Sequence, residues 1–129
     1  MNTKYDKVMV VDDNQFDIYI TSKLITSNGL AKEVLEFDSS ILALEYLTNH
    51  KEDYDKLPQL IFLDIYMPRI DGFEFIEKLR GLGKAINEYC TLCIVSSTVN
   101  DYYIHKAKID EGITLFTNKP ITKEFIKSL

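Results

Sequence analysis

The chain has 129 residues, of which 15 are Lys or Arg and 20 are Asp or Glu, so its formal net charge at pH 7 is −5. This length suits one domain with a core that needs no disulfide or metal to hold it together. A net acidic domain lacks the positive surface that nonspecific nucleic-acid binding requires. Its apolar runs are too short for a membrane span, and no signal peptide is evident. We therefore expect a single domain over residues 1–129 that is soluble and cytoplasmic, with neither a membrane nor a nucleic acid as direct partner.

In the first part of the chain, short apolar runs alternate with segments of helical periodicity. The predicted elements are a strand at 8–11, a helix at 14–27, a strand at 32–37 and a helix that follows Asp38-Ser39-Ser40 and ends near residue 49. The apolar residues expected to face inward are Phe16, Ile20 and Leu24 in the first helix and Ile41, Leu44 and Leu47 in the second. Polar cap residues precede both helices, and Asn28-Gly29 stops the first.

The rest of the chain repeats this alternation after a polar loop at 51–56. The predicted elements are a strand at 60–63, a helix bearing Phe75, Leu79 and Leu82, a connecting loop at 84–89, a strand at 92–95, a helix capped by Asp101 with Ile104 and Ala107 inward, a strand at 114–116 and a last helix capped by Thr122. Five strands that alternate with five helices predict an α/β fold with a parallel sheet covered on both faces. The last helix is short, either naturally or because the sequence is truncated there.

The two cysteines, Cys90 and Cys93, have the C-x-x-C spacing that also occurs in zinc sites and redox motifs. Zinc would need further ligands, and the two histidines, His50 and His105, are both distant in sequence. A redox pair usually lies at the start of a helix, whereas these residues lie in a strand-like run. We predict two reduced, buried cysteines.

Polar residues capable of chemistry follow four of the predicted strands. They are Asp12 and Asp13 after the first strand, Asp64 after the third, Ser96 and Ser97 after the fourth and Lys119 after the fifth. In a parallel sheet these strand ends lie at one edge, and open α/β sheets bind ligands there, where the strand order reverses. If the order is 2-1-3-4-5, the first and third strands are neighbours and the three carboxylates converge.

Three carboxylates in one pocket require a neutralising partner. Oxygen ligands with room for water favour Mg²⁺, and Lys119 with a serine hydroxyl suits an anion held beside the metal. With a carboxylate nucleophile, these groups are the components of phosphoryl transfer onto an aspartate. Each residue alone has an ordinary structural explanation: Asp13 as a helix cap, Lys119 as a solvated charge, Ser96 as a turn residue. Their coincidence at one edge favours the functional interpretation.

Four motifs span nearly the whole chain. They are Val10-Val11-Asp12-Asp13-Asn14, Asp64-x-x-Met67-Pro68-x-x-Asp71-Gly72, Ser96-Ser97 and Phe116-x-x-Lys119-Pro120. In these motifs and their order, the sequence resembles the receiver domain of two-component response regulators, of the single-domain chemotaxis type. The resemblance implies a flavodoxin-like, doubly wound sheet of five parallel strands in the order 2-1-3-4-5, with five helices.

The resemblance also implies a chemistry. Asp64 accepts a phosphoryl group from a sensor histidine kinase or a phosphotransfer protein. Asp13, Asp64 and the backbone carbonyl of Tyr66 bind Mg²⁺. Asp12 acts mainly through a metal-bound water, and Lys119 binds a phosphoryl oxygen. The domain would then catalyse only its own phosphorylation and dephosphorylation, so it would not be an enzyme toward other substrates.

The same resemblance implies a switch. The Ser96 hydroxyl moves to contact the phosphoryl group, and Phe116 swings inward behind it and reshapes a partner-binding face. Ser97 is the alternative hydroxyl, because counting back from Lys119 without a gap favours it. Phe116 stands where Tyr is also frequent, and it lacks the hydroxyl. The Lys119-Pro120 peptide bond is expected to be cis.

Tyr66 and Thr98, two positions beyond Asp64 and Ser96, are implied to tune hydrolysis of the acyl phosphate. The bulk of Tyr66 predicts a long-lived phosphoryl state. The downstream partner is an unidentified protein, for which the aromatic segment 102–105 provides a candidate surface. Since no output domain follows Leu129, we expect that the chain either signals by direct docking or is a receiver cut from a larger response regulator or hybrid kinase.

Three other classes fit less well. A phosphatase of the haloacid-dehalogenase type needs a second Asp two residues after the nucleophile, where this chain has Tyr66. A flavin-binding flavodoxin needs a phosphate loop rich in Ser, Thr and Gly, whereas the first loop here is Asp12-Asp13-Asn14. A degenerate receiver that acts only as an interaction module would not be expected to keep the complete set of site residues.

Overall fold

The computed structural model describes residues 2–65, 67, 69–96 and 115–129. The strands are β1 (Tyr5–Val11), β2 (Ala31–Phe37), β3 (Leu60–Asp64), β4 (Thr91–Ser96) and β5 (Leu115–Asn118). The helices are α1 (Gln15–Ser27), α2 (Ser40–Asn49), α3 (Gly72–Arg80), α4 (Lys84–Tyr89) and α6 (Lys123–Ser128). All strand pairs are parallel, in the order β2-β1-β3-β4-β5, which confirms the predicted doubly wound fold.

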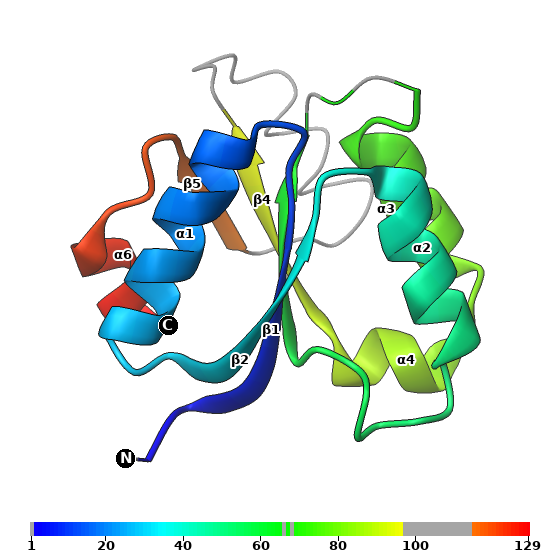
Figure 1. Ribbon diagram of the computed structural model, residues 1–129. Helices are drawn as coiled ribbons and strands as arrows, with labels where there is room; N and C mark the ends of the chain where they lie inside the picture. Colours follow the sequence, from blue (N-terminus) through cyan, green and yellow to red (C-terminus); the bar gives the residue numbers. More distant parts are fainter. Residues whose placement is uncertain (1, 66, 68, 97–114) are drawn as a thin grey trace.

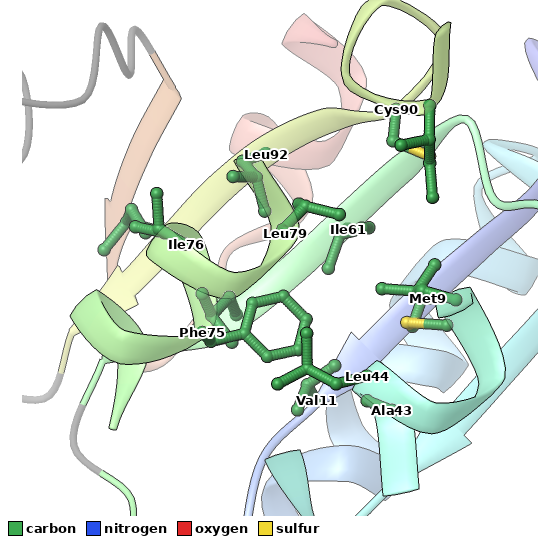
Figure 2. Close-up of a cluster of buried hydrophobic side chains, with 14 of the residues drawn as sticks. Met9, Val11, Ala43, Leu44, Ile61, Phe75, Ile76, Leu79, Cys90 and Leu92 are labelled. Atoms are coloured by element: carbon green, nitrogen blue, oxygen red, sulfur yellow. The ribbon is translucent and has the colours of Figure 1, made fainter. Parts of the chain in front are cut away.

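Helices cover both faces of the sheet, with α1 and α6 on one side and α2, α3 and α4 on the other (Figure 1). Alternate residues of each strand therefore enter different cores. Met9 and Val11 join the core under α2, α3 and α4, which we call the first core, whereas Val8 and Val10 join the second core under α1 and α6. Figure 2 shows the first core, where Phe75 and other side chains of α3 lie over the strands. Within the described ranges, every helix is too short or too polar to cross a bilayer.

The inward face of α1 differs from the predicted one. Its buried residues are Ile18, Thr21 and Ile25; of the predicted residues, Leu24 packs partly buried against the second core, whereas Phe16 is 70% exposed. The helix begins after Asn14, whose side chain accepts a hydrogen bond from the Asp17 backbone N–H. Spacings of three and four residues place 18, 21 and 25 on one stripe, so the sequence offers two competing stripes on this helix. The stripe that packs against the sheet is the one that contains Thr21.

Two further expectations are corrected, one in α2 and one in the segment that precedes β4. In α2, Leu44 and Leu47 are buried as predicted, but Ile41 is 40% exposed. The predicted loop at 84–89 is the helix α4. One buried side chain, Ile86, and the amide of Asn87, which donates to the Leu79 and Gly83 carbonyls, hold this short helix in place.

The two cysteines are buried and free, as predicted. Cys90 lies at the C-cap of α4, rather than in a strand, and belongs to the first core. Cys93 lies in β4 and belongs to the second core on the opposite face of the sheet. Two thiols on opposite faces do not form a zinc or redox pair.

The C-terminal part agrees with the sequence where the structure describes it. The Thr122 hydroxyl accepts a hydrogen bond from the Phe125 backbone N–H, which caps α6, and Ile126 is buried. The predicted helix capped by Asp101 and the aromatic segment 102–105 lie outside the described residues.

Candidate functional site

Strand register brings the first and third strands to one edge with their carboxylates side by side. Val11 pairs with Leu63, so Asp12 and Asp64 follow at the same level of the sheet. The Asp12 backbone N–H donates to the carbonyl of Phe37 at 3.1 Å, which extends the pairing with β2. The predicted convergence of acidic residues from separate strands is therefore present.

Asp12, Asp13 and Asp64 each offer a carboxylate oxygen, and these atoms lie within 4.8 Å of one another. Asp12 and Asp64 are buried, at 5% and 4% exposure, whereas Asp13 is exposed. One Asp12 oxygen accepts a hydrogen bond from the Asn14 backbone N–H at 2.9 Å. A cluster of oxygen donors with one side open to solvent suits a hard cation that keeps part of its water, as Mg²⁺ does.

Lys119 enters this acidic site from the end of β5. Its backbone N–H donates to the Ser96 carbonyl at 2.8 Å, and its peptide bond to Pro120 is cis, as expected. The Nζ atom lies 2.8 Å from Asp12 Oδ2 and 3.4 Å from Asp64 Oδ2. It also lies 2.8 Å from Asp17 Oδ2, a contact that was not predicted.

The acidic neighbours keep Lys119 charged. Burial by itself lowers the pKa of this amine, but hydrogen bonds to Asp12 and Asp17 and the charge of Asp64 outweigh it, so the pKa lies above its ordinary value. An ammonium that stays charged beside buried carboxylates can form charge-assisted hydrogen bonds with an anion.

Asp17 is the site residue that sequence reasoning missed. It lies in the first turn of α1, where acidic residues commonly complement the helix dipole. Asp17 follows Asp13 by about one helical turn, and this spacing was a weak signal that both side chains face the same edge of the sheet. The contact with Lys119 joins residues 102 positions apart, which no local pattern reveals.

The structure places the predicted switch residues on β4 and β5. Ser96 ends β4, is 3% exposed and pairs with Asn118 in the sheet. Phe116 pairs with Ile94 and packs, partly buried, against the first core. The alternative hydroxyl Ser97, together with Tyr66 and Thr98, lies outside the described residues.

The connection from β3 to α3 is held close to the strand that carries Asp64. The Gly72 backbone N–H donates to the Ile65 carbonyl at 3.0 Å, and a Cβ atom on Gly72 would lie 2.6 Å from the Ile65 Cα. The Asp71 side chain caps α3 by accepting from the Glu74 backbone N–H. The Asp-Gly pair after the acidic strand therefore has a steric reason: only glycine allows this approach.

A pocket of about 200 Å³ opens beside the cluster. Among its lining residues are Asp13, Asp38, Ser39, Met67 and Arg69. It leaves Asp13, the exposed member of the cluster, open to solvent on this side.

The family model of the response regulator receiver domain matches residues 8–129. Hybrid signal transduction histidine kinase L of Dictyostelium discoideum is 33% identical over 124 residues, which are 95% of this chain. The chain spans 7% of that relative's length.

Among solved structures, a response regulator receiver protein from Dyadobacter fermentans is 31% identical, with a TM-score of 0.80 and 95% of each chain covered. The receiver domain of the Arabidopsis thaliana histidine kinase CKI1, complexed with Mg²⁺ and BeF3⁻, is 29% identical, with a TM-score of 0.76 and coverage of 96% of this chain and 91% of that one. With its fold, its acidic cluster and these relatives together, the chain belongs to the response regulator receiver domain family of two-component signalling.

Proposed function

We propose that Asp64 is the phosphoacceptor of a two-component phosphorelay. Receiver domains are generally non-catalytic phosphoacceptors that interact with histidine kinases or phosphotransfer proteins and bind Mg²⁺ at an acidic pocket. The observation that carries the proposal is the position of Asp64: it is buried at a strand end, within 4.8 Å of two other carboxylates and 3.4 Å from the Lys119 ammonium.

Asp12, Asp13 and Asp64, with the Tyr66 backbone carbonyl, are the proposed Mg²⁺ ligands, Asp12 acting mainly through a metal-bound water. Support comes from the chemistry of the donor set, because the clustered side-chain atoms are all carboxylate oxygens. When bound, the metal neutralises charge on the phosphoryl oxygens during transfer.

The chain's own residues carry out the rest of the reaction. An Asp64 oxygen attacks the phosphorus of a phosphohistidine; an O–P bond forms on Asp64 as the P–N bond breaks and the imidazole leaves. Lys119, already charged, holds a phosphoryl oxygen in place. Ser96, or its neighbour Ser97, contacts another phosphoryl oxygen, and Phe116 moves with it, so that the partner-binding face of the domain changes.

The proposed partner is a sensor histidine kinase or a phosphotransfer protein in the cytoplasm, and the signal then passes to a further protein rather than directly to a nucleic acid or a membrane. Phe16 and Tyr19 on α1, 70% and 61% exposed, offer an apolar surface near the acidic edge for such a partner. Large exposed aromatic side chains close to a reactive site are suited to protein docking.

The test is incubation with Mg²⁺ and acetyl phosphate, followed by intact-mass measurement. The wild-type chain is expected to gain one phosphoryl group that is lost in acid or hydroxylamine, and Asp64→Asn is expected to gain none. Asp38→Asn is the matched control, because Asp38 is an exposed carboxylate at the same edge but outside the acidic cluster; this variant should be labelled like the wild type. Labelling of Asp64→Asn equal to that of the wild type would assign the acceptor elsewhere.

A further inference from the structure

The Lys119 ammonium is shared among three carboxylates from three parts of the fold. Asp12 and Asp17 lie 2.8 Å from Nζ, whereas Asp64 lies 3.4 Å away. The ammonium is therefore drawn toward α1, on which Asp17 lies, and away from the strand that carries the proposed phosphoacceptor. Three acceptors match the three protons of the ammonium.

We propose that Asp17 is a positioning residue that holds the Lys119 ammonium away from Asp64 and thereby weakens the phosphoryl-bearing state. This inference rests on the proposed function of Asp64 and Lys119, and adds that a residue in the first turn of α1 regulates the phosphoryl-bearing state. Asp17 touches neither the phosphoryl group nor the metal in this scheme, and acts through Lys119.

Competition for the ammonium is the first reason. A phosphoryl oxygen on Asp64 needs a short contact with Nζ, and charge-assisted hydrogen bonds are strongest at about 2.7–2.9 Å. The ammonium already makes such a short contact with Asp17, whose side chain is about one third exposed. To bind the phosphoryl oxygen equally closely, it must move toward β3 and lengthen the contact with Asp17.

The second reason is net charge, which also disfavours the phosphoryl-bearing state. Asp17 adds a fourth carboxylate to the three of the cluster, against the one ammonium of Lys119. A phosphoryl group adds further negative charge to this site. At the short separations within a partly buried site such repulsion is weakly screened, so Asp17 raises the free energy of the charged product.

A purely structural role for Asp17 makes a different prediction. The helix cap involves its backbone N–H, which donates to the Asn14 side chain and is kept in Asp17→Asn. If the ion pair served only to fasten α1 to the end of β5, the substitution would lower thermal stability without favouring anion binding. Asp17→Glu keeps the negative charge, so under the proposal it should bind an anion much as the wild type does.

The experiment measures the dissociation constant of beryllofluoride, a stand-in for the phosphoryl group, at saturating Mg²⁺. The variants are wild type, Asp17→Asn, Asp17→Glu and Asp38→Asn. Asp38 is an exposed acid at the same edge whose described polar contact is with Gln15, so its loss controls for net charge. We expect Asp17→Asn to lower the dissociation constant about three- to tenfold, and the other two variants to stay within about twofold of the wild type.

Each outcome decides something. An unchanged or higher dissociation constant in Asp17→Asn overturns the inference while leaving the proposed function intact, provided that the wild type binds. An equal gain in Asp38→Asn also overturns it, because net charge alone would then be the cause. If the wild-type chain with Mg²⁺ fails to bind beryllofluoride at all, the proposed function fails first and the inference with it.

Discussion

At the scale of single residues, the site combines burial with charge. Asp12 and Asp64 are almost completely buried, and a buried carboxylate is costly unless it is paired and hydrogen-bonded. Lys119 lies within ion-pair distance of both, and the Asn14 backbone N–H donates to Asp12. The pairing offsets part of the cost but leaves an excess of negative charge, which a divalent cation can neutralise.

Tyr66 gives a prediction about the lifetime of the phosphoryl state. We predict that the bulk of Tyr66 hinders the attacking water. Tyr66→Asn is then expected to lose the phosphoryl group about tenfold faster, which corresponds to a barrier lower by about 1.4 kcal/mol. The measurement is the decay of acid-labile phosphate after removal of acetyl phosphate. Tyr66→Phe keeps the bulk and should decay like the wild type. Faster loss in the wild type than in Tyr66→Asn contradicts the prediction.

The sequence alone located all three carboxylates of the acidic cluster but not the contact between Lys119 and Asp17. Asp12, Asp13 and Asp64 were found because each follows an apolar strand, and parallel strands bring their ends to one edge. Asp17 was missed because its importance comes from a tertiary contact with Lys119. Sequence patterns report periodicity along the chain; they do not report which distant side chain a helix will meet.

At the scale of elements, strand prediction succeeded more fully than helix orientation. Each described strand overlaps its predicted range. In β1, β3 and β4 the reason is an unbroken buried apolar run, which a strand covered on both faces needs. The face of α1 was misassigned because the predicted stripe is entirely apolar, whereas the buried stripe contains Thr21; packing against the sheet decides between them. The helix α4 was missed because it rests on Ile86 and the hydrogen bonds of Asn87, with too few turns to show periodicity.

The connection between β3 and α3 gives a prediction about stability. In Gly72→Ala the new Cβ would lie 2.6 Å from the Ile65 backbone, so either α3 or the strand end must shift. We expect the free energy of unfolding to fall by about 1–3 kcal/mol, as in overpacked cores, measured by urea denaturation.

Gly81 supplies the matched control for this substitution. It has helical backbone angles, φ −71° and ψ −12°, and a Cβ there would lie 3.4 Å from the nearest atom, the Lys78 carbonyl oxygen. Gly81→Ala should therefore leave stability unchanged or raise it by up to about 1 kcal/mol, because the unfolded chain loses freedom. Equal losses in both variants would show that the close approach at Gly72 is not what matters.

At the scale of the whole molecule, the sheet separates two hydrophobic cores, one on each face. Cys90 contributes a thiol to the first core and Cys93 contributes one to the second, so the ionisation of each thiol depends on burial on a different face of the sheet. Burial raises the pKa of both thiols from an ordinary value of 9.0 to about 12. Both therefore remain protonated in the native state at neutral pH and are poor nucleophiles.

These shifts predict how global stability depends on pH. Between pH 9.0 and about 12, the unfolded chain releases thiol protons that the native chain retains, so the free energy of unfolding falls as pH rises. Each thiol contributes a slope of at most about 1.4 kcal/mol per pH unit in that window, and nothing below it. Urea denaturation of the wild type and of Cys93→Ala at several pH values above and below 9.0 measures the slope.

Cys93→Ala leaves a cavity, so its stability should be lower at neutral pH, but its decline above pH 9.0 should be shallower than that of the wild type. The comparison cancels the other groups that titrate in this range, including Tyr46 and Tyr89, whose pKa values burial also raises. Parallel curves for the two proteins would mean that the Cys93 thiol ionises as readily in the folded chain as in the unfolded one. Such a result would contradict its burial in the second core, because a thiolate enclosed by apolar side chains has no counter-charge to stabilise it.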